Sequence, residues 1–331
     1  MKKLKTAAVT AVMIGICSLL GGCTAVQVNE RMYVQMMGLS EEDGECVLCV
    51  QVCSTESAPD EPPVYEFYEG RGEGFRQAAA DIEQKNGREL FFGHCTLAAL
   101  DKNFLYSTED IKLLMGERIS PGCRVCCSDD PGEFLSRKSS GESEKNIGAD
   151  VISGELDQYE KRGQYKEVTL KDVCIMADKA APGVLPAFFD EKIGSGAVAF
   201  STGENKEVLY LSANETALCN MLKEENGAEF SVLGGTVKTD KVSNAVYLQT
   251  GENILNISIN AECTLTETGN SHSLSDYETE AENAITAALS ELLNKAEASE
   301  MTEAVTGVKT EKGTVFNCNV NVKIKSSDRI R

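Results

Sequence analysis

Few side chains in this chain could act as a general base at neutral pH. Histidine most often fills that role, and the chain contains two, His94 and His272. His94 lies in the apolar run 90–95, so we expect a core or structural histidine rather than a catalytic one. His272 lies in a polar loop and is expected to be solvated. The sequence has no Gly-x-Ser-x-Gly elbow, no His-Glu-x-x-His motif and no phosphate-binding loop with Lys-Ser/Thr. We therefore predict a protein without catalytic residues or a cofactor.

A glycine-rich run, Gly70-Arg71-Gly72-Glu73-Gly74, precedes a predicted helix. Free amide groups at a helix N-terminus can bind an anion. The acidic Glu73 inside the run argues against phosphate. We interpret the run as a loop-to-helix turn, with an anion site as the alternative.

The chain has thirteen cysteines, and two clusters at 46–53 and 123–127 contain C-x-x-C pairs, a spacing typical of zinc sites. Cys46 and Cys49 fall in a predicted strand, where side chains three positions apart face opposite sides and cannot share a metal ion. We interpret these cysteines as small buried apolar side chains and predict no metal site. A metal-binding redox protein is the alternative.

Cys23 has a different setting. It closes the run Leu20-Gly21-Gly22-Cys23, after three lysines and the uncharged apolar stretch 7–20. This layout is typical of an export signal, and the stretch is too short for a permanent membrane span. The cysteine after Leu-Gly-Gly resembles the lipobox of bacterial lipoproteins. That resemblance implies removal of residues 1–22 and attachment of a diacylglycerol, with palmitate-type acyl chains, to Cys23. An ordinary secretory signal with a chance cysteine is the alternative.

The charge of the chain restricts its partners. The net charge is −20, and removal of residues 1–22, with three lysines and no acid, makes it −23. Such a surface repels nucleic acid and anionic lipid headgroups. Membrane attachment is therefore expected to depend on the lipid, whose two acyl chains suffice for stable anchoring. No other window of about 18 apolar residues occurs, so no transmembrane helix is expected after the signal.

Hydrophobic periodicity predicts an α+β chain with several domains, in which mixed β-sheets pack against helices without regular βαβ alternation. Strands are predicted over 31–39, 45–53, 89–100, 122–127, 197–201, 207–211, 230–233, 245–249, 254–265 and 315–324. Helices are predicted over 73–86, 108–118, 169–181, 214–225 and 275–298. Ser275 and Glu278 have the spacing of a capping box for the last helix.

Changes in composition suggest four segments. The polar stretch 128–165 is expected to form an exposed connection or a partly ordered helix. We therefore predict a signal peptide at 1–22, an N-terminal α+β domain at 23–127, a polar connection and middle domain at 128–190, and a C-terminal α+β domain at 191–331.

The order of these elements and several short motifs resemble one family, the C-subunit lipoproteins of bacterial spore germinant receptors (Ger(x)C or GerAC type). The motif that carries most weight is Arg88-Glu89-Leu90-Phe91-Phe92-Gly93-His94, similar to the family's Arg-x-Leu…Gly-His entry into a buried strand. Further similar stretches are 29–31, 36–39, 74–82, 168–172, 185–186, 196–200, 215–216, 275–298 and the last strand. The chain departs from the family at 24–28, where Thr-Ala-Val-Gln-Val replaces most of the usual Trp-Asp-Arg-Arg-Glu, and in the shortened stretch 300–313.

This resemblance implies three α+β domains and a non-enzymatic role. Members of the family are anchored to the outer face of the spore inner membrane and work with membrane-embedded A-type and B-type subunits, in a complex that senses nutrients and triggers germination. The implied partners are those subunits and the bilayer, reached through the lipid on Cys23, and no nucleic acid. Arg88, Gly93 and His94 are expected to be structural or contact residues. The alternative function is a solute-binding lipoprotein of a transporter, which usually has two doubly wound domains.

Overall fold

The structure is a computed structural model, and it describes residues 31–53, 64–106, 108–116, 119–136, 148–179, 181–189, 192–200, 208–225, 227–249, 251–267 and 272–325. The predicted signal peptide and Cys23 lie outside the described residues. No helix in the described ranges is long and apolar enough to span a bilayer.

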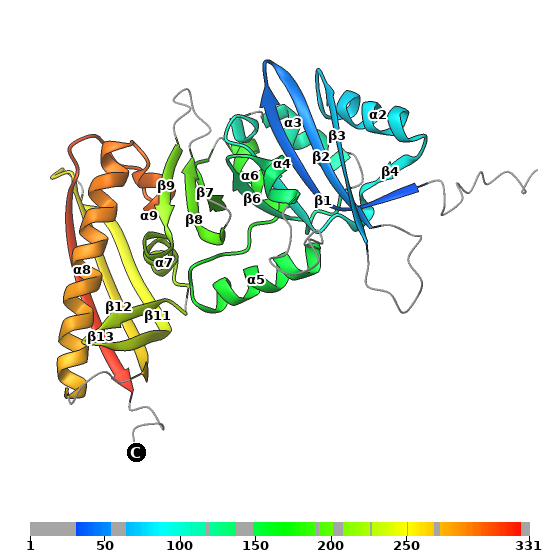
Figure 1. Ribbon diagram of the computed structural model, residues 1–331. Coiled ribbons are helices and arrows are strands. Elements are labelled where there is room, and N and C mark those ends of the chain that lie inside the picture. The colour runs from blue at the N-terminus through cyan, green and yellow to red at the C-terminus, as the bar shows by residue number, and fades with distance from the viewer. Residues whose placement is uncertain are drawn as a thin grey trace, which may run out of the picture.

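A large mixed sheet forms the N-terminal part of the molecule (Figure 1). Its strands lie in the order β3-β2-β1-β5-β6-β7-β8-β9, and β4 pairs with the start of β1. Their bounds are β1 (Arg31–Glu42), β2 (Glu45–Cys53), β3 (Tyr65–Gly72), β4 (Glu89–Phe91), β5 (Leu97–Leu100), β6 (Arg124–Ser128), β7 (Gly183–Phe189), β8 (Lys192–Phe200) and β9 (Val208–Ser212). Pairing is parallel from β1 through β5, β6 and β7 and antiparallel at both ends, which confirms the predicted mixed α+β class.

Helices cover both faces of this sheet because its buried side chains alternate between two cores. One core joins the strands to α2 (Phe75–Asn86), α3 (Thr108–Gly116) and α6 (Leu170–Lys179). The other joins them to α4 (Pro131–Leu135) and α5 (Ala149–Lys161). Within the described part of the polar stretch 128–165, the chain forms the two helices α4 and α5. Cys46 belongs to the first core and Cys49 to the second, so the two thiols face opposite sides, as predicted.

The predicted strand over 89–100 is wrong in its middle. The chain leaves the sheet after Phe91, makes a 3-10 turn at η2 (Phe92–His94) and re-enters it at β5. Phe92 and Cys95 are buried on either side of the exposed Gly93 and His94. The unbroken apolar run in the sequence does not reveal this turn, because Phe92 packs into the core from a 3-10 turn rather than from a strand.

The glycine run 70–74 brings a helix close to the sheet. A Cβ atom at Gly70 would lie 2.2 Å from the carbonyl oxygen of Ala78 in α2, and one at Gly72 would lie 2.8 Å from the Ala78 nitrogen. Gly74 is the N-cap of α2. The predicted turn into the helix is present, but it starts from strand β3 rather than from a loop. Gly70 and Gly72 let the backbone of α2 pack directly on β3.

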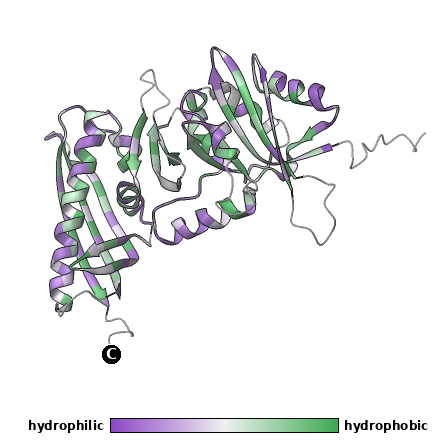
Figure 2. Cartoon of the chain, viewed as in Figure 1, coloured by the Kyte–Doolittle hydropathy of each residue, from purple (hydrophilic) through white to green (hydrophobic). Residues whose placement is uncertain are grey.

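A second sheet lies at the opposite end of the molecule from β4 (Figure 1). It contains β10 (Glu229–Val232), β11 (Gly235–Gln249), β12 (Ile254–Glu267) and β13 (Val315–Lys325), in that order, with β13 parallel to β12. The long helix α8 (Leu274–Ala298) covers one face, and the short α9 (Thr302–Thr306) follows it. Figure 2 shows hydrophilic residues on the outer side of α8 and hydrophobic residues among the strands it covers.

The cap of α8 lies two residues earlier than predicted. Ser273 and Asp276 form the capping box: Asp276 accepts from the Ser273 amide at 2.8 Å, and Ser273 Oγ accepts from the Asp276 amide at 3.2 Å. Glu278, predicted as part of the box, instead accepts from the amide of Ile324 on edge strand β13 at 2.8 Å. The capping-box spacing occurs twice in this stretch, which is why the sequence pattern was ambiguous.

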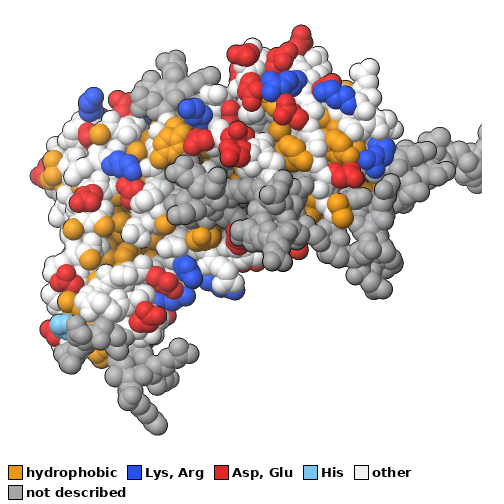
Figure 3. All heavy atoms as spheres, in the orientation of Figure 1, with side chains coloured by type: hydrophobic (Ala, Val, Ile, Leu, Met, Phe, Trp, Pro, Cys, Tyr) orange, Lys and Arg blue, Asp and Glu red, His pale blue; other side chains and the backbone are white. Residues whose placement is uncertain are grey.

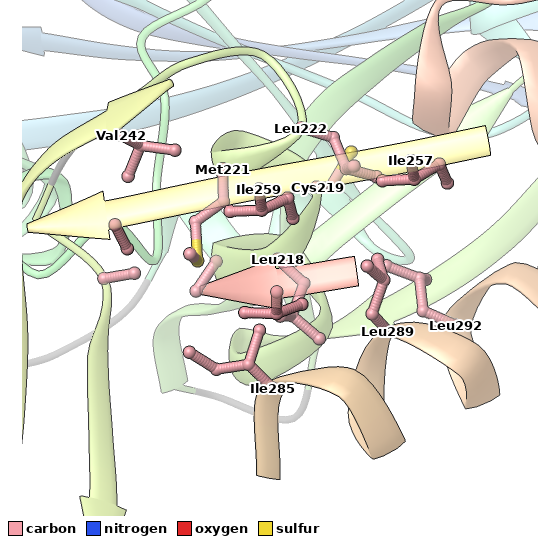
Figure 4. Close-up of a cluster of buried hydrophobic side chains, with 14 of the residues drawn as sticks. Leu218, Cys219, Met221, Leu222, Val242, Ile257, Ile259, Ile285, Leu289 and Leu292 are labelled. Atoms are coloured by element: carbon pink, nitrogen blue, oxygen red, sulfur yellow. The ribbon is translucent and has the colours of Figure 1, made fainter. Parts of the chain in front are cut away.

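Helix α7 (Ala213–Met221) links the two sheets. It begins with a capping box made by Ser212 and Glu215. Figure 4 shows its apolar side chains pointing toward those of β12 and α8 in one core. Two of the predicted domain boundaries, after 127 and after 190, fall within the run of strands that forms the large sheet. The division into domains stays a prediction.

Candidate functional site

The three residues predicted as structural or contact residues lie in the short segment between α2 and β5, but the structure does not bring them all together. Arg88 is directed toward β3, where its guanidinium lies 3.7 Å from Glu66 and donates to the Tyr68 hydroxyl at 3.4 Å. His94 contacts Tyr33 and Phe91 instead. The segment therefore has two separate sets of contacts.

Arg88 takes part in a small polar group that fastens the segment to β3. The Tyr68 hydroxyl donates to Glu66, and burial together with that hydrogen bond raises the pKa of Tyr68. Side chains of Arg88 and Glu66 are 34% and 38% exposed. A pair this exposed contributes about 0–1 kcal/mol, so Arg88 orients the segment more than it stabilises it.

His94 is exposed, so its predicted place in the core is wrong. Its ring centroid lies 5.7 Å from that of Tyr33 and 5.6 Å from that of Phe91, and the Tyr33 and Phe91 centroids are 5.7 Å apart. Gly93 makes this arrangement possible, because a Cβ atom there would lie 2.6 Å from the Phe91 ring. The turn thus places a histidine beside two aromatic rings at the surface.

Arg31 completes this surface. Its guanidinium carbon lies 5.3 Å from the centroid of the Phe91 ring, within the range of a cation–π contact. Its Nε lies 3.5 Å from the Glu89 carboxylate. We call Arg31, Tyr33, Phe91 and His94 the anchor-side patch, because Arg31 opens the first described strand, eight residues after Cys23, the predicted site of lipid attachment.

Residue alternation did not reveal this patch. In the parallel pairing of β1 with β4, Arg31 lies opposite Glu89 and Tyr33 lies opposite Phe91, so the side chains of these two pairs share one face of the sheet. Parallel register between segments nearly sixty residues apart cannot be read from local patterns. The only signal in the sequence is the matching order of a charged and an aromatic residue at 31 and 33 and at 89 and 91.

An open hollow of about 430 Å³ lies beside the patch, with His94, Thr96, Ser120, Arg124 and Ser153 in its lining. The lining includes the guanidinium group of Arg124. This group lies 2.8 Å from the Asp157 carboxylate and 3.3 Å from that of Glu167, and it donates to the Ser153 carbonyl at 3.4 Å. These partners already balance its charge. The hollow therefore lacks the uncompensated cation expected of an anion site.

The cysteine clusters do not assemble into a metal site in the described part of the chain, where no three His, Cys, Asp or Glu side chains lie close enough to share an ion. Burial raises the pKa of Cys49 and of Cys127 to about 12. Contact with Cys95, whose sulfur is 3.8 Å away, and burial raise the pKa of Cys123. Cys49, Cys123 and Cys127 thus belong to the two apolar cores of the large sheet.

One prediction separates the two neighbours in the turn. Phe92 is 7% exposed and its ring lies 5.3 Å from Phe75, so Phe92→Ala should lower the free energy of unfolding by about 3 kcal/mol. His94→Ala removes only surface ring contacts and should cost less than about 1 kcal/mol. Urea denaturation of both variants measures the difference. If both variants lost the same free energy of unfolding, His94 would have to be a core residue, as first predicted.

Comparison with known proteins gives two findings. Residues 24–188 match the family model described as the spore germination protein N-terminal domain. The crystal structure of the GerBC protein is similar over 87% of this chain and 96% of that chain, with a TM-score of 0.51 and 13% sequence identity. At this identity the likeness concerns the fold, and it agrees with the mixed α+β architecture. No curated protein sequence matches the chain.

Proposed function

This chain belongs to the spore germination protein family, as a germinant-receptor C subunit of the GerAC/GerBC type, and we propose that it works as a lipid-anchored, non-enzymatic receptor subunit. The N-terminal domain of the family corresponds to residues 24–188. The anchor is a diacylglycerol on Cys23. The site of action is the outer face of the spore inner membrane, where the subunit contacts membrane-embedded A-type and B-type subunits.

The observation that carries this proposal is the position of Cys23 relative to the family domain. The domain match begins at residue 24, the position after the cysteine, and the first strand begins at Arg31. Eight residues span at most about 29 Å even when fully extended. A lipid on Cys23 would therefore hold the folded domain against the membrane, within reach of partners embedded in it.

Two further observations favour contact with proteins over chemistry or solute capture. The hollow beside His94 is open, and its arginine is already paired. The large sheet is mixed and antiparallel at both ends, unlike the doubly wound domains usual in solute-binding lipoproteins.

Deletion of the gene in the host tests the proposal. Spores without this protein should fail to lose optical density in response to the nutrient that its receptor senses. Direct enzymatic digestion of the spore cortex bypasses the receptor and should still trigger outgrowth, which is the control. Deletion spores that respond normally to every nutrient to which the parent strain responds would contradict the proposed role.

A further inference from the structure

The anchor-side patch combines aromatic rings with polar tips and a cation. Tyr33 and Phe91 lie on adjacent strands, Arg31 lies over Phe91, and the exposed His94 touches both rings. Tyrosine and arginine are suited to a membrane–water interface, where an apolar body and a polar end meet different surroundings. The patch thus has the chemistry of a lipid-contacting surface rather than of a solvated one.

The charge of the patch also differs from that of the chain. Across the whole sequence acids exceed bases by twenty, so most of the surface repels an anionic bilayer. Within the patch, Arg31 is paired with Glu89, and the adjacent Arg88 is paired with Glu66. The local balance is neutral. Figure 3 shows acidic and basic side chains side by side on the visible face of the N-terminal sheet.

Position supplies the third argument. The patch includes Arg31, the first described residue, and the C-terminal sheet lies at the far end of the molecule (Figure 1). If Cys23 carries the lipid, the patch cannot be farther than about 29 Å along the chain from the bilayer. Of the surfaces described here, this one is tied to the membrane by the shortest chain.

From these observations we propose that the anchor-side patch rests on the headgroup and glycerol region of the bilayer and sets the orientation of the subunit. This inference rests on the proposed lipid anchor. The rings of Tyr33 and Phe91 enter the interface, and Arg31 and His94 meet the headgroups. The C-terminal sheet and the acidic helix α8 that covers it point away from the membrane.

The absence of tryptophan from this chain makes the test specific. A single tryptophan is introduced by His94→Trp in the patch or by Tyr247→Trp in β11, as a matched control at a site that is 57% exposed. Both proteins, expressed from the full-length gene so that the host can process and lipidate them, are reconstituted in phosphatidylethanolamine–phosphatidylglycerol vesicles, with and without lipid brominated near the carbonyl end of its acyl chains. We expect brominated lipid to lower the fluorescence of His94→Trp by about twofold and to leave that of Tyr247→Trp nearly unchanged.

Flotation of the same samples separates the possible failures. If both proteins float with the vesicles but neither tryptophan is quenched, or both are quenched equally, the patch does not orient the subunit on lipid and the inference is overturned, while the anchor stands. If the proteins do not float, the lipid anchor itself is wrong and the inference fails with it.

Discussion

Replacement of Cys23 by Ser should remove the lipid and reduce the fraction of processed protein in washed membranes by about tenfold. Only the thiol can form the thioether to diacylglycerol, and no described helix could hold the chain in a bilayer instead. The charge of −23 that remains after residues 1–22 are removed would then repel anionic headgroups.

The measurement combines labelling with a radioactive fatty acid and fractionation after a high-salt wash. Cys17→Ser is the matched control, because it makes the same change within the apolar stretch of the signal and should retain label and membrane attachment. Precursor that keeps residues 1–22 is recognised by its larger mass and counted separately. Processed Cys23→Ser protein that stays in the washed membranes would show that another attachment exists.

Gly70→Ala should lower the free energy of unfolding by about 2–3 kcal/mol. The added methyl group would lie 2.2 Å from the Ala78 carbonyl oxygen and 2.6 Å from Ile82 Cγ1. Neither the α2 backbone nor the fully buried Ile82 can move aside without opening the contact between α2 and β3. The substitution therefore forces the helix away from the sheet.

Gly154→Ala is the control for this prediction. Gly154 lies within α5 with no neighbouring atom near the position of a Cβ, so the same change should stabilise the protein by about 0.5–1 kcal/mol. Urea denaturation followed by circular dichroism measures both variants. Equal stability of Gly70→Ala and the parent would mean that α2 does not pack on β3 as closely as described.

Local patterns predicted most single elements of this fold. The hairpin of β1 and β2 follows from two apolar runs separated by an acidic turn, which Asp43 and Gly44 make with positive φ angles. Helix α2, predicted over 73–86, is followed by Gly87, whose φ of 66° is the left-handed conformation typical of a glycine at a helix C-terminus. Strand β13 follows from its strict alternation of apolar and polar residues. Each of these signals lies within about a dozen residues of sequence.

Features that depend on distant parts of the chain escaped prediction. The parallel pairing of β13 with β12 joins segments separated by the whole of α8. The parallel pairing of β1 with β4 sets Tyr33 beside Phe91. The prediction of which residues are buried at the η2 turn was wrong for a related reason. Phe92 and His94 lie two positions apart in one apolar run, and the geometry of the turn decides which of them faces the core.

The candidate site was predicted in part. The segment from Arg88 to His94 was selected by its resemblance to a family motif, and the structure places Gly93 and His94 at a surface with Phe91. Arg31 and Tyr33 were not selected, because their role depends on that long-range pairing. The contact role of Arg88, Gly93 and His94 stays a prediction.

The most direct test of a lipid-anchored subunit is the mass of its N-terminal peptide. Protein extracted from host membranes with detergent is digested, and the first peptide is measured by mass spectrometry. Our account predicts a peptide that begins at Cys23 and carries diacylglycerol on its sulfur. A peptide that begins at any other residue, or at Cys23 with a free thiol, would contradict it.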